Sequence, residues 1–270
     1  MIDISIITTS YNYDQYISET IESVLAQTYS NWEMIIFDDG SSDNSLEIIQ
    51  SYCNKDSRIK LYTHPNNENK GLITTLKAAI EKAEGKYIVF LESDDYITPD
   101  YLEEKIQVFN NEEVGLVYNN FEFAGDYKNY GLEKLRKEII TKWSKKPLAG
   151  DISEWLLLKN YIPTFSIVML KKETLKDLNY NSPKPESIDW WLWIQIASKY
   201  KIGYISKPLT YWRMHKDSYL QREKPKISLL EDYKFSCKIC KLNRPELFWK
   251  YHIVFFALYL YRRVKKLFFR

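Results

Sequence analysis

The sequence predicts an α/β protein in which a mostly parallel sheet is covered by helices on both faces. Through the first hundred residues, short runs rich in β-branched and aromatic residues alternate with segments whose apolar residues have helical spacing. Polar turn segments separate these runs. The fourth run, at residues 87–91, is almost entirely apolar, which is typical of a strand buried on both faces of a parallel sheet.

Each element of the first half follows from its local pattern. Strands are expected over residues 4–7, 32–37, 59–62 and 87–91, and helices over residues 16–27, 46–52 and 72–83. One face of the first helix is formed by Ile17, Ile21, Val24 and Leu25. The polar segment 38–43 is a turn, in which Ser42 or Asp43 can cap the helix that follows.

The second half is less regular. We expect helices over residues 101–110, 152–158, 174–178 and 188–198, a strand over residues 115–118, and one or two strands over residues 202–211, interrupted at Pro208. Residues 124–150 are polar and have no assignable pattern. Two helices follow residue 224, separated near Asn243 to Pro245. The expected organisation is one domain with two halves, residues 1–105 and 106–222, and a helical tail at residues 223–270.

Three polar segments follow predicted strands, at residues 8–12, 38–41 and 92–95. Because the carboxyl ends of parallel strands meet at one edge of the sheet, these segments should converge on a ligand site. Asp94 and Asp95 are costly to keep ionised together unless a cation neutralises them. Oxygen ligands favour Mg²⁺ or Mn²⁺, although an Asp-rich turn without any ligand is equally consistent with the spacing.

Composition restricts the other functional classes. Neither a dinucleotide fingerprint nor a P-loop motif occurs, so phosphate charge would be met by a metal or by basic side chains. Three cysteines cannot build a disulfide framework, and no signal peptide or 18-residue apolar stretch is seen, so we expect a cytoplasmic protein. The charge is divided unevenly: residues 224–270 hold 12 Lys or Arg and 3 Asp or Glu, a net +9, whereas residues 1–223 carry −7.

The ordered motifs resemble the family-2 inverting glycosyltransferases of GT-A fold. The resemblance covers residues 3–218 and rests on seven short segments: 5–12 (SIITTSYN), 21–29 (IESVLAQTY), 38–43 (DDGSSD), 83–88 (AEGKYI), 91–99 (LESDDYITP), 189–193 (DWWLW) and 211–215 (YWRMH). It implies a Rossmann-like, mostly parallel sheet flanked by helices. It also implies transfer of a sugar from a nucleotide-diphosphate-sugar to an acceptor hydroxyl, in surface polysaccharide or lipid-linked glycan synthesis.

The resemblance also assigns roles to individual residues. Contacts to the nucleotide-sugar are implied for Thr9, Tyr11, Asp39, Gly71, Ser93 and Asp94. Asp95 and His215 would lie at the Mn²⁺ or Mg²⁺ ion that bridges the diphosphate, and Asp189 would be the general base. Glu92 stands where the family usually has Asp. Aromatic rings suit sugars, and Trp190 is the one tryptophan near Asp189 that we nominate for acceptor contact.

Two alternatives have different consequences. A nucleotidyltransferase would share the metal and the nucleotide but needs a basic, glycine-rich N-terminal loop, which the sequence lacks. A non-catalytic nucleotide-sugar-binding module would have no need of Asp94, Asp95, Asp189 and His215 together.

The basic tail is aromatic and too short to span a bilayer. It suits the surface of an anionic membrane, so that the enzyme would be peripheral on the inner face, with Phe255, Phe256, Phe268 and Phe269 inserting. A helix packed on the catalytic domain and a homodimer contact are the alternatives. The acidic body argues against nucleic acid as a partner.

Overall fold

The structure is a computed structural model that describes residues 2–125, 149–182, 184–215 and 229–268. In this part of the chain, an eight-stranded sheet has the order β3-β2-β1-β4-β7-β6-β8-β5. The strands are β1 (Ile4–Ser10), β2 (Trp32–Asp38), β3 (Ile59–Thr63), β4 (Tyr87–Phe90), β5 (Tyr96–Ile97), β6 (Val114–Ala124), β7 (Val168–Lys171) and β8 (Lys201–Arg213). Strands β1 to β4 are mutually parallel, as predicted. The sheet is mixed beyond β4, because β7 runs antiparallel to β4 and β6, and β5 antiparallel to β8.

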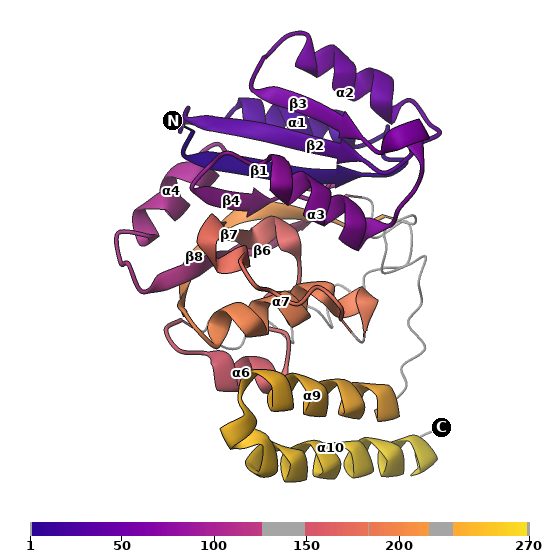
Figure 1. Cartoon of the computed structure of the whole chain (residues 1–270), viewed down its shortest axis with the longest axis vertical. Helices are drawn as coiled ribbons and strands as arrows, with labels where there is room; N and C mark the ends of the chain where they lie inside the picture. Colours follow the sequence, from indigo (N-terminus) through magenta and orange to yellow (C-terminus); the bar gives the residue numbers. More distant parts are fainter. Residues whose placement is uncertain (1, 126–148, 183, 216–228, 269–270) are drawn as a thin grey trace.

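Helices cover both faces of the sheet, as Figure 1 shows. They are α1 (Ile17–Leu25), α2 (Ser45–Cys53), α3 (Leu72–Lys82), α4 (Tyr101–Val108), α6 (Ser153–Leu158), α7 (Ile188–Ala197), α9 (Leu229–Asn243) and α10 (Phe248–Phe268). Alternation along the strands divides the core in two. On β2, Met34 and Ile36 pack with α1 and α2, whereas Ile35 and Phe37 pack with α3 and α7. The apolar face of α1 and the alternation along the strands therefore build two core layers, one on each face of the sheet.

The second half departs from the sequence prediction in four places. The strand expected over residues 115–118 is longer, since β6 runs to Ala124. Strand β7 was not predicted, because four residues after a short 3₁₀ turn are too few to show a strand period. The helix expected over residues 174–178 is wrong: the chain forms a 3₁₀ turn, η3 (Lys172–Leu175), and Asp177 adopts a φ of 62° that ends any helix. Strand β8 continues past Pro208, which lies opposite an irregularity in the pairing with β6.

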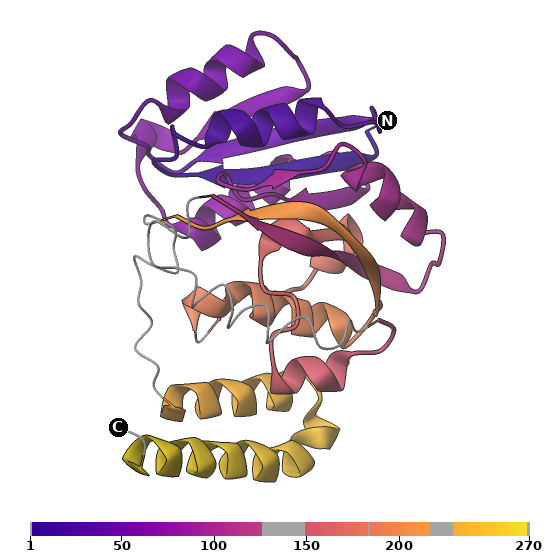
Figure 2. The same ribbon diagram turned by 180° about the vertical axis from the view of Figure 1, so that it is seen from behind.

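The C-terminal segment is part of the fold. Helices α9 and α10 meet at a 3₁₀ turn, η5 (Pro245–Leu247), as predicted, and lie side by side at one end of the molecule (Figures 1 and 2). Phe235 of α9 and Phe255 of α10 are buried in the same core cluster as α7. The prediction that Phe255 inserts into a membrane is therefore wrong, since it faces the protein. Phe269 and the side chain of Phe268 lie outside the described residues. No helix in the described ranges is long and apolar enough to cross a membrane.

Candidate active site

The three polar segments predicted to converge do lie at one edge of the sheet. Strands β1 and β2 are in register up to the pair Ser10 and Asp38, and the amide of Asp39 donates to the carbonyl oxygen of Ser10 at 2.8 Å. Strand β4 is parallel to β1 and delivers the third segment, residues 92–95, beside the first. Parallel pairing thus places all three segments at the carboxyl ends of their strands.

Asp38 stabilises the turn that follows β2. Its Oδ1 atom accepts from the amides of Gly40 and Ser41, and its Oδ2 atom accepts from the Ser41 hydroxyl at 2.6 Å. Gly40 has a φ of +83°, and a Cβ there would lie 2.7 Å from the carbonyl oxygen of Asn67. The turn therefore needs glycine both for its backbone angle and for its close approach to the next loop. Asp38 is fully buried and has a structural role.

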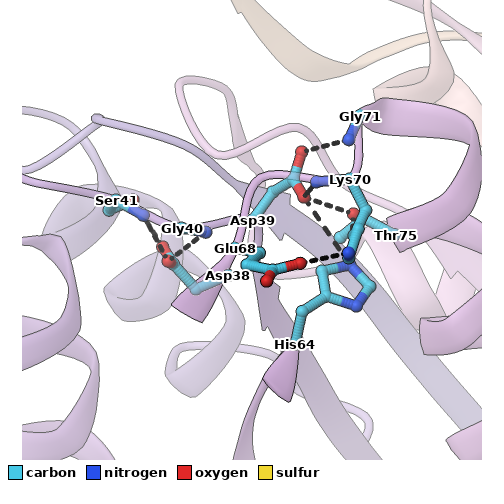
Figure 3. A network of polar contacts seen from close by, with 9 residues as sticks. All are labelled: Asp38, Asp39, Gly40, Ser41, His64, Glu68, Lys70, Gly71 and Thr75. Carbon is cyan, nitrogen blue, oxygen red and sulfur yellow. Dashed lines mark hydrogen bonds and ion pairs between the residues drawn. The ribbon is translucent and has the colours of Figure 1, made fainter. Parts of the chain in front are cut away.

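Asp39 holds the loop that connects β3 to α3, as Figure 3 shows. Its carboxylate accepts from the amides of Lys70 and Gly71 at 2.7 and 3.0 Å, and from the Thr75 hydroxyl at 2.8 Å. His64 Nε2 lies 2.8 Å from the same hydroxyl. Two of the residues predicted to contact the nucleotide, Asp39 and Gly71, are thus joined by a hydrogen bond. His64 and Thr75 were missed, because nothing in their sequence surroundings marks them as partners of Asp39.

Asp95 is fully buried at the end of the acidic segment. Its Oδ1 atom accepts from the Arg213 amide at 2.8 Å, whereas Oδ2 has no hydrogen-bond partner among the described residues. Burial raises the pKa of Asp95 well above its usual range, and repulsion from Asp94 and Glu92 raises it further. Interactions with the Ser166 hydroxyl and the Arg213 amide oppose this rise. A buried carboxylate oxygen without a donor, beside two other acids, is an atom that a cation would stabilise.

Strand β8 brings Asp94 and His215 together across 121 residues of sequence. His215 Nε2 lies 3.0 Å from Asp94 Oδ2, and the Arg213 side chain donates to the Asp94 carbonyl oxygen at 2.7 Å. The His215 ring packs against Tyr16, with ring centroids 4.4 Å apart. His215 thus contacts Asp94, whereas Asp95 is bonded to the Arg213 amide two residues before His215. In the described ranges, however, no group of three or more His, Cys, Asp or Glu side chains is arranged to hold a metal ion.

Glu92 connects the acidic segment to the turn before β7. Its carboxylate accepts from the Thr164 hydroxyl, and its amide donates to the Ser166 hydroxyl at 3.0 Å. Burial raises the pKa of Glu92 to about 8, with further contributions from the charges of Asp94 and Asp189. Sequence reasoning missed Thr164 and Ser166, because they lie 72 and 74 residues from Glu92 on an element that was not predicted.

Asp189 lies in the first turn of α7, close enough to Glu92 for its charge to raise the pKa of Glu92. Its Oδ2 atom accepts from the Asn160 amide group at 2.9 Å. Burial raises the pKa of Asp189 to about 7, and hydrogen bonds from the Trp190 amide and from Asn160 limit the rise. A carboxyl group with this pKa is partly ionised at neutral pH and retains enough basicity to accept a proton.

The remaining predicted residues have mixed surroundings. Tyr11 is exposed just beyond β1, Thr9 is half-buried on that strand, and Ser93 is buried, with its carbonyl oxygen accepting from Thr20. The Trp190 indole donates to the Leu156 carbonyl oxygen at 2.6 Å, and its ring packs 5.1 Å from that of Phe235. These contacts direct Trp190 toward the C-terminal helices, so acceptor contact by Trp190 stays a prediction without support from its packing.

Solved glycosyltransferase structures share this fold. A fragment of S. aureus TarS in complex with UDP-GlcNAc superposes with a TM-score of 0.62 at 19% identity, over 88% of this chain and 66% of that one. The mannosyltransferase PcManGT from Pyrobaculum calidifontis, in complex with GDP-Man and Mn²⁺, superposes with a TM-score of 0.56 at 15% identity, over 87% of this chain and 62% of that one. The fold class is thus that of GT-A glycosyltransferases.

Sequence comparison gives the family. The model of glycosyl transferase family 2 matches residues 5–178. A glycosyltransferase of Haemophilus influenzae is 33% identical over 215 residues, covering 80% of each chain. The Escherichia coli protein WfaP, a UDP-Glc:alpha-D-GlcNAc-diphosphoundecaprenol beta-1,3-glucosyltransferase, is 33% identical over 80% of this chain and 78% of its own. The chain belongs to glycosyltransferase family 2, and it is a sugar-transferring enzyme.

Proposed function

We propose that the protein transfers a sugar from a uridine-diphosphate sugar to a hydroxyl group of a lipid-linked glycan, with inversion at the anomeric carbon. The observation that carries this proposal is the Asp189 carboxyl group, whose pKa is raised to about 7 beside the acidic segment at the end of β4. A general base needs this combination of position and basicity.

The donor would bind at the carboxyl edge of β1, β2 and β4. The Asp39 carboxylate fixes the loop at this edge through the amides of Lys70 and Gly71, and Tyr11 is exposed just beyond β1. We assign base and ribose contacts to Thr9, Tyr11 and Asp39, and contacts to the ribose and diphosphate to Ser93 and Asp94. Asp39 Oδ2 has one amide donor, which leaves it capacity to accept a hydrogen bond from a nucleotide base.

We infer that this edge would take a divalent cation, Mn²⁺ or Mg²⁺. Asp95 Oδ2 is buried without a donor, and the neighbouring residue Asp94 contacts His215 at 3.0 Å. These ions bind in many enzymes through one or two carboxylates together with substrate phosphates, so a protein site with few ligands is consistent with such an ion. When bound, the cation would neutralise charge on the departing nucleotide diphosphate. The Mn²⁺ complex of PcManGT supports this assignment.

Asp189 would take the acceptor proton during the displacement. The Asn160 amide orients its Oδ2 atom, and burial keeps its basicity high. As the acceptor hydroxyl attacks the anomeric carbon from the side opposite the diphosphate, Asp189 removes its proton and the bond to the diphosphate breaks. A single displacement of this kind inverts the anomeric centre.

The curated relatives suggest the substrates. WfaP and a second E. coli protein, WfgD, are both named as UDP-Glc:alpha-D-GlcNAc-diphosphoundecaprenol beta-1,3-glucosyltransferases, and WfgD is 32% identical over 75% of this chain. We therefore propose a UDP-hexose donor and a lipid-diphosphate-linked sugar acceptor, used by a peripheral enzyme at the inner face of the membrane.

The experiment is a transfer assay with UDP-glucose and a synthetic GlcNAc-diphospho-lipid, with Mn²⁺, Mg²⁺ or a chelator. We expect a disaccharide-lipid whose new linkage has the configuration opposite to that of the donor, formed with metal and lost with chelator. A product that retains the donor configuration would refute the single displacement. Full activity in chelator would refute the metal assignment.

A further inference from the structure

The outermost helix, α10, presents a stripe of exposed apolar side chains. Six of the ten large hydrophobic residues exposed among the described residues lie on this helix: Trp249, Ile253, Val254, Phe256, Leu260 and Tyr261. Trp249 and Ile253 are 75% and 70% exposed. Spacings of four, three and four residues separate Trp249, Ile253, Phe256 and Leu260, so these four side chains follow one face of the helix.

The opposite face of α10 packs on the protein, which fixes the orientation of the stripe. Tyr251 and Phe255 are buried in the core cluster that includes α7, and the Tyr251 hydroxyl donates to Glu154 of α6. Helix α10 lies at one end of the molecule, and the described elements leave its outer side uncovered (Figures 1 and 2). An apolar face that is both fixed in orientation and uncovered is typical of an interaction surface.

The charge of this segment indicates which partner covers the stripe. Helix α10 contains no acidic residue, and its C-terminal turns carry four basic ones: Arg262, Arg263, Lys265 and Lys266. The segment from residue 224 has a net charge of +9. Two copies of this helix packed together would bring like charges into proximity, whereas an anionic bilayer would neutralise them.

We propose that α10 is a membrane-docking helix that lies in the plane of an anionic bilayer with the stripe from Trp249 to Leu260 inserted. The apolar side chains would enter the boundary between headgroups and acyl chains, and the basic C-terminal turns would contact anionic headgroups. Through this surface the enzyme would reach the lipid-linked acceptor of the proposed function. The exposed apolar face is present whether or not that acceptor is the substrate.

The test is flotation of the full-length protein with vesicles of phosphatidylcholine alone or with about 30% phosphatidylglycerol. We expect binding to the anionic vesicles that weakens at high salt, because the electrostatic part is screened. Trp249→Ser combined with Ile253→Ser should reduce partitioning roughly 10- to 100-fold, since two exposed apolar side chains no longer insert. Arg262→Gln with Arg263→Gln should reduce it about fivefold per residue on anionic vesicles only.

The matched control is Leu72→Ser, which replaces an exposed apolar residue on α3. Helix α3 lies far from α10 in both views (Figures 1 and 2). This control variant should leave vesicle binding unchanged. The double variant Trp249→Ser with Ile253→Ser, the stripe variant, should keep the melting temperature of the wild type, which shows that it folds. Calorimetry should show that it still binds UDP, so that a loss of vesicle binding is distinguished from a failure of the proposed function. The inference is overturned if the wild type ignores anionic vesicles, or if the stripe variant binds them as well as the wild type does. If the wild type is a dimer that does not bind vesicles, and the stripe variant is a monomer, the stripe is instead a contact with a second copy of the chain.

Discussion

Replacing Asp189 with Asn should stabilise the protein at neutral and basic pH while removing most of its activity. The Asn side chain keeps the shape of Asp189 and can still accept from the Asn160 amide, whose nitrogen lies 2.9 Å from Oδ2. It cannot ionise, however, so the cost of a buried carboxylate disappears together with the proton acceptor. A buried charge that is needed for activity lowers the stability of the folded protein, so its removal commonly raises stability and lowers activity.

The magnitude follows from the pKa of Asp189, which is about 7 in the folded protein against an ordinary value of 3.8. Because the folded pKa is raised, the favourable contribution of this group is complete below pH 3.8 and is lost as the pH rises to about 7. The slope is about 1.36 kcal/mol per pH unit within that window. Between pH 5 and pH 8, the free energy of unfolding of the wild type should therefore fall by about 2.5 kcal/mol relative to Asp189→Asn. Partial solvent exposure of the side chain makes this an upper value.

Urea unfolding at pH 5, 6, 7 and 8, in chelator, measures this difference. The matched control is Glu33→Gln. Burial opposes ionisation of Glu33, but hydrogen bonds from Lys60 and Ser5 keep the pKa of Glu33 below its usual value. Its folded pKa is lowered, so its contribution is present above about pH 4.5, and the Gln variant should be less stable than the wild type across the whole range. If the Asp189→Asn gap does not widen with pH, the raised pKa is refuted.

Activity gives the second measurement on the same variant. Transfer should fall by roughly two to four orders of magnitude in Asp189→Asn, the usual share of a general base, whereas UDP binding should persist. In the wild type, kcat/KM should rise about tenfold per pH unit up to about pH 7 and then level off, because only the ionised carboxylate accepts a proton. Near-normal turnover in the variant would move the base to another residue.

Three further variants test the edge of the sheet. In Asp95→Asn, the Asn side chain can still accept a hydrogen bond from the Arg213 amide but offers no charge to a cation. Mn²⁺ should therefore no longer raise the melting temperature in the presence of UDP. An undiminished effect of Mn²⁺ would mean that Asp95 is not a metal ligand. Thr75→Val removes a buried donor to Asp39 and should cost about 1–3 kcal/mol in urea unfolding, together with weaker UDP binding in calorimetry; unchanged values would show that the loop is held without it. Gly40→Ala places a Cβ 2.7 Å from the carbonyl oxygen of Asn67 at a φ of +83°, and should cost at least about 1 kcal/mol by the same unfolding measurement; a neutral substitution would mean that the loop moves freely.

Local sequence determined the parallel half of this protein. Strands β1 to β4 and their helices were predictable because their apolar residues recur with the spacing of a strand or of a helix, two or 3.6 residues. Parallel pairing then places the polar segments after these strands together. The adjacent pair Asp94 and Asp95 was visible for the same reason, since both acids follow a strand that is apolar almost throughout.

Only the tertiary structure decided how these acids are held. The Thr164 hydroxyl reaches Glu92 from 72 residues away, and Thr75 reaches Asp39 from 36 residues away, so neither contact leaves a local pattern in the sequence. The same is true of α10, where composition indicated an apolar, basic helix but not which face is buried. Phe255 is buried and Phe256 is exposed, although both are phenylalanines and they are adjacent in the sequence. Burial and pKa depend on what the rest of the chain places nearby, and that is set by packing between distant segments rather than by periodicity.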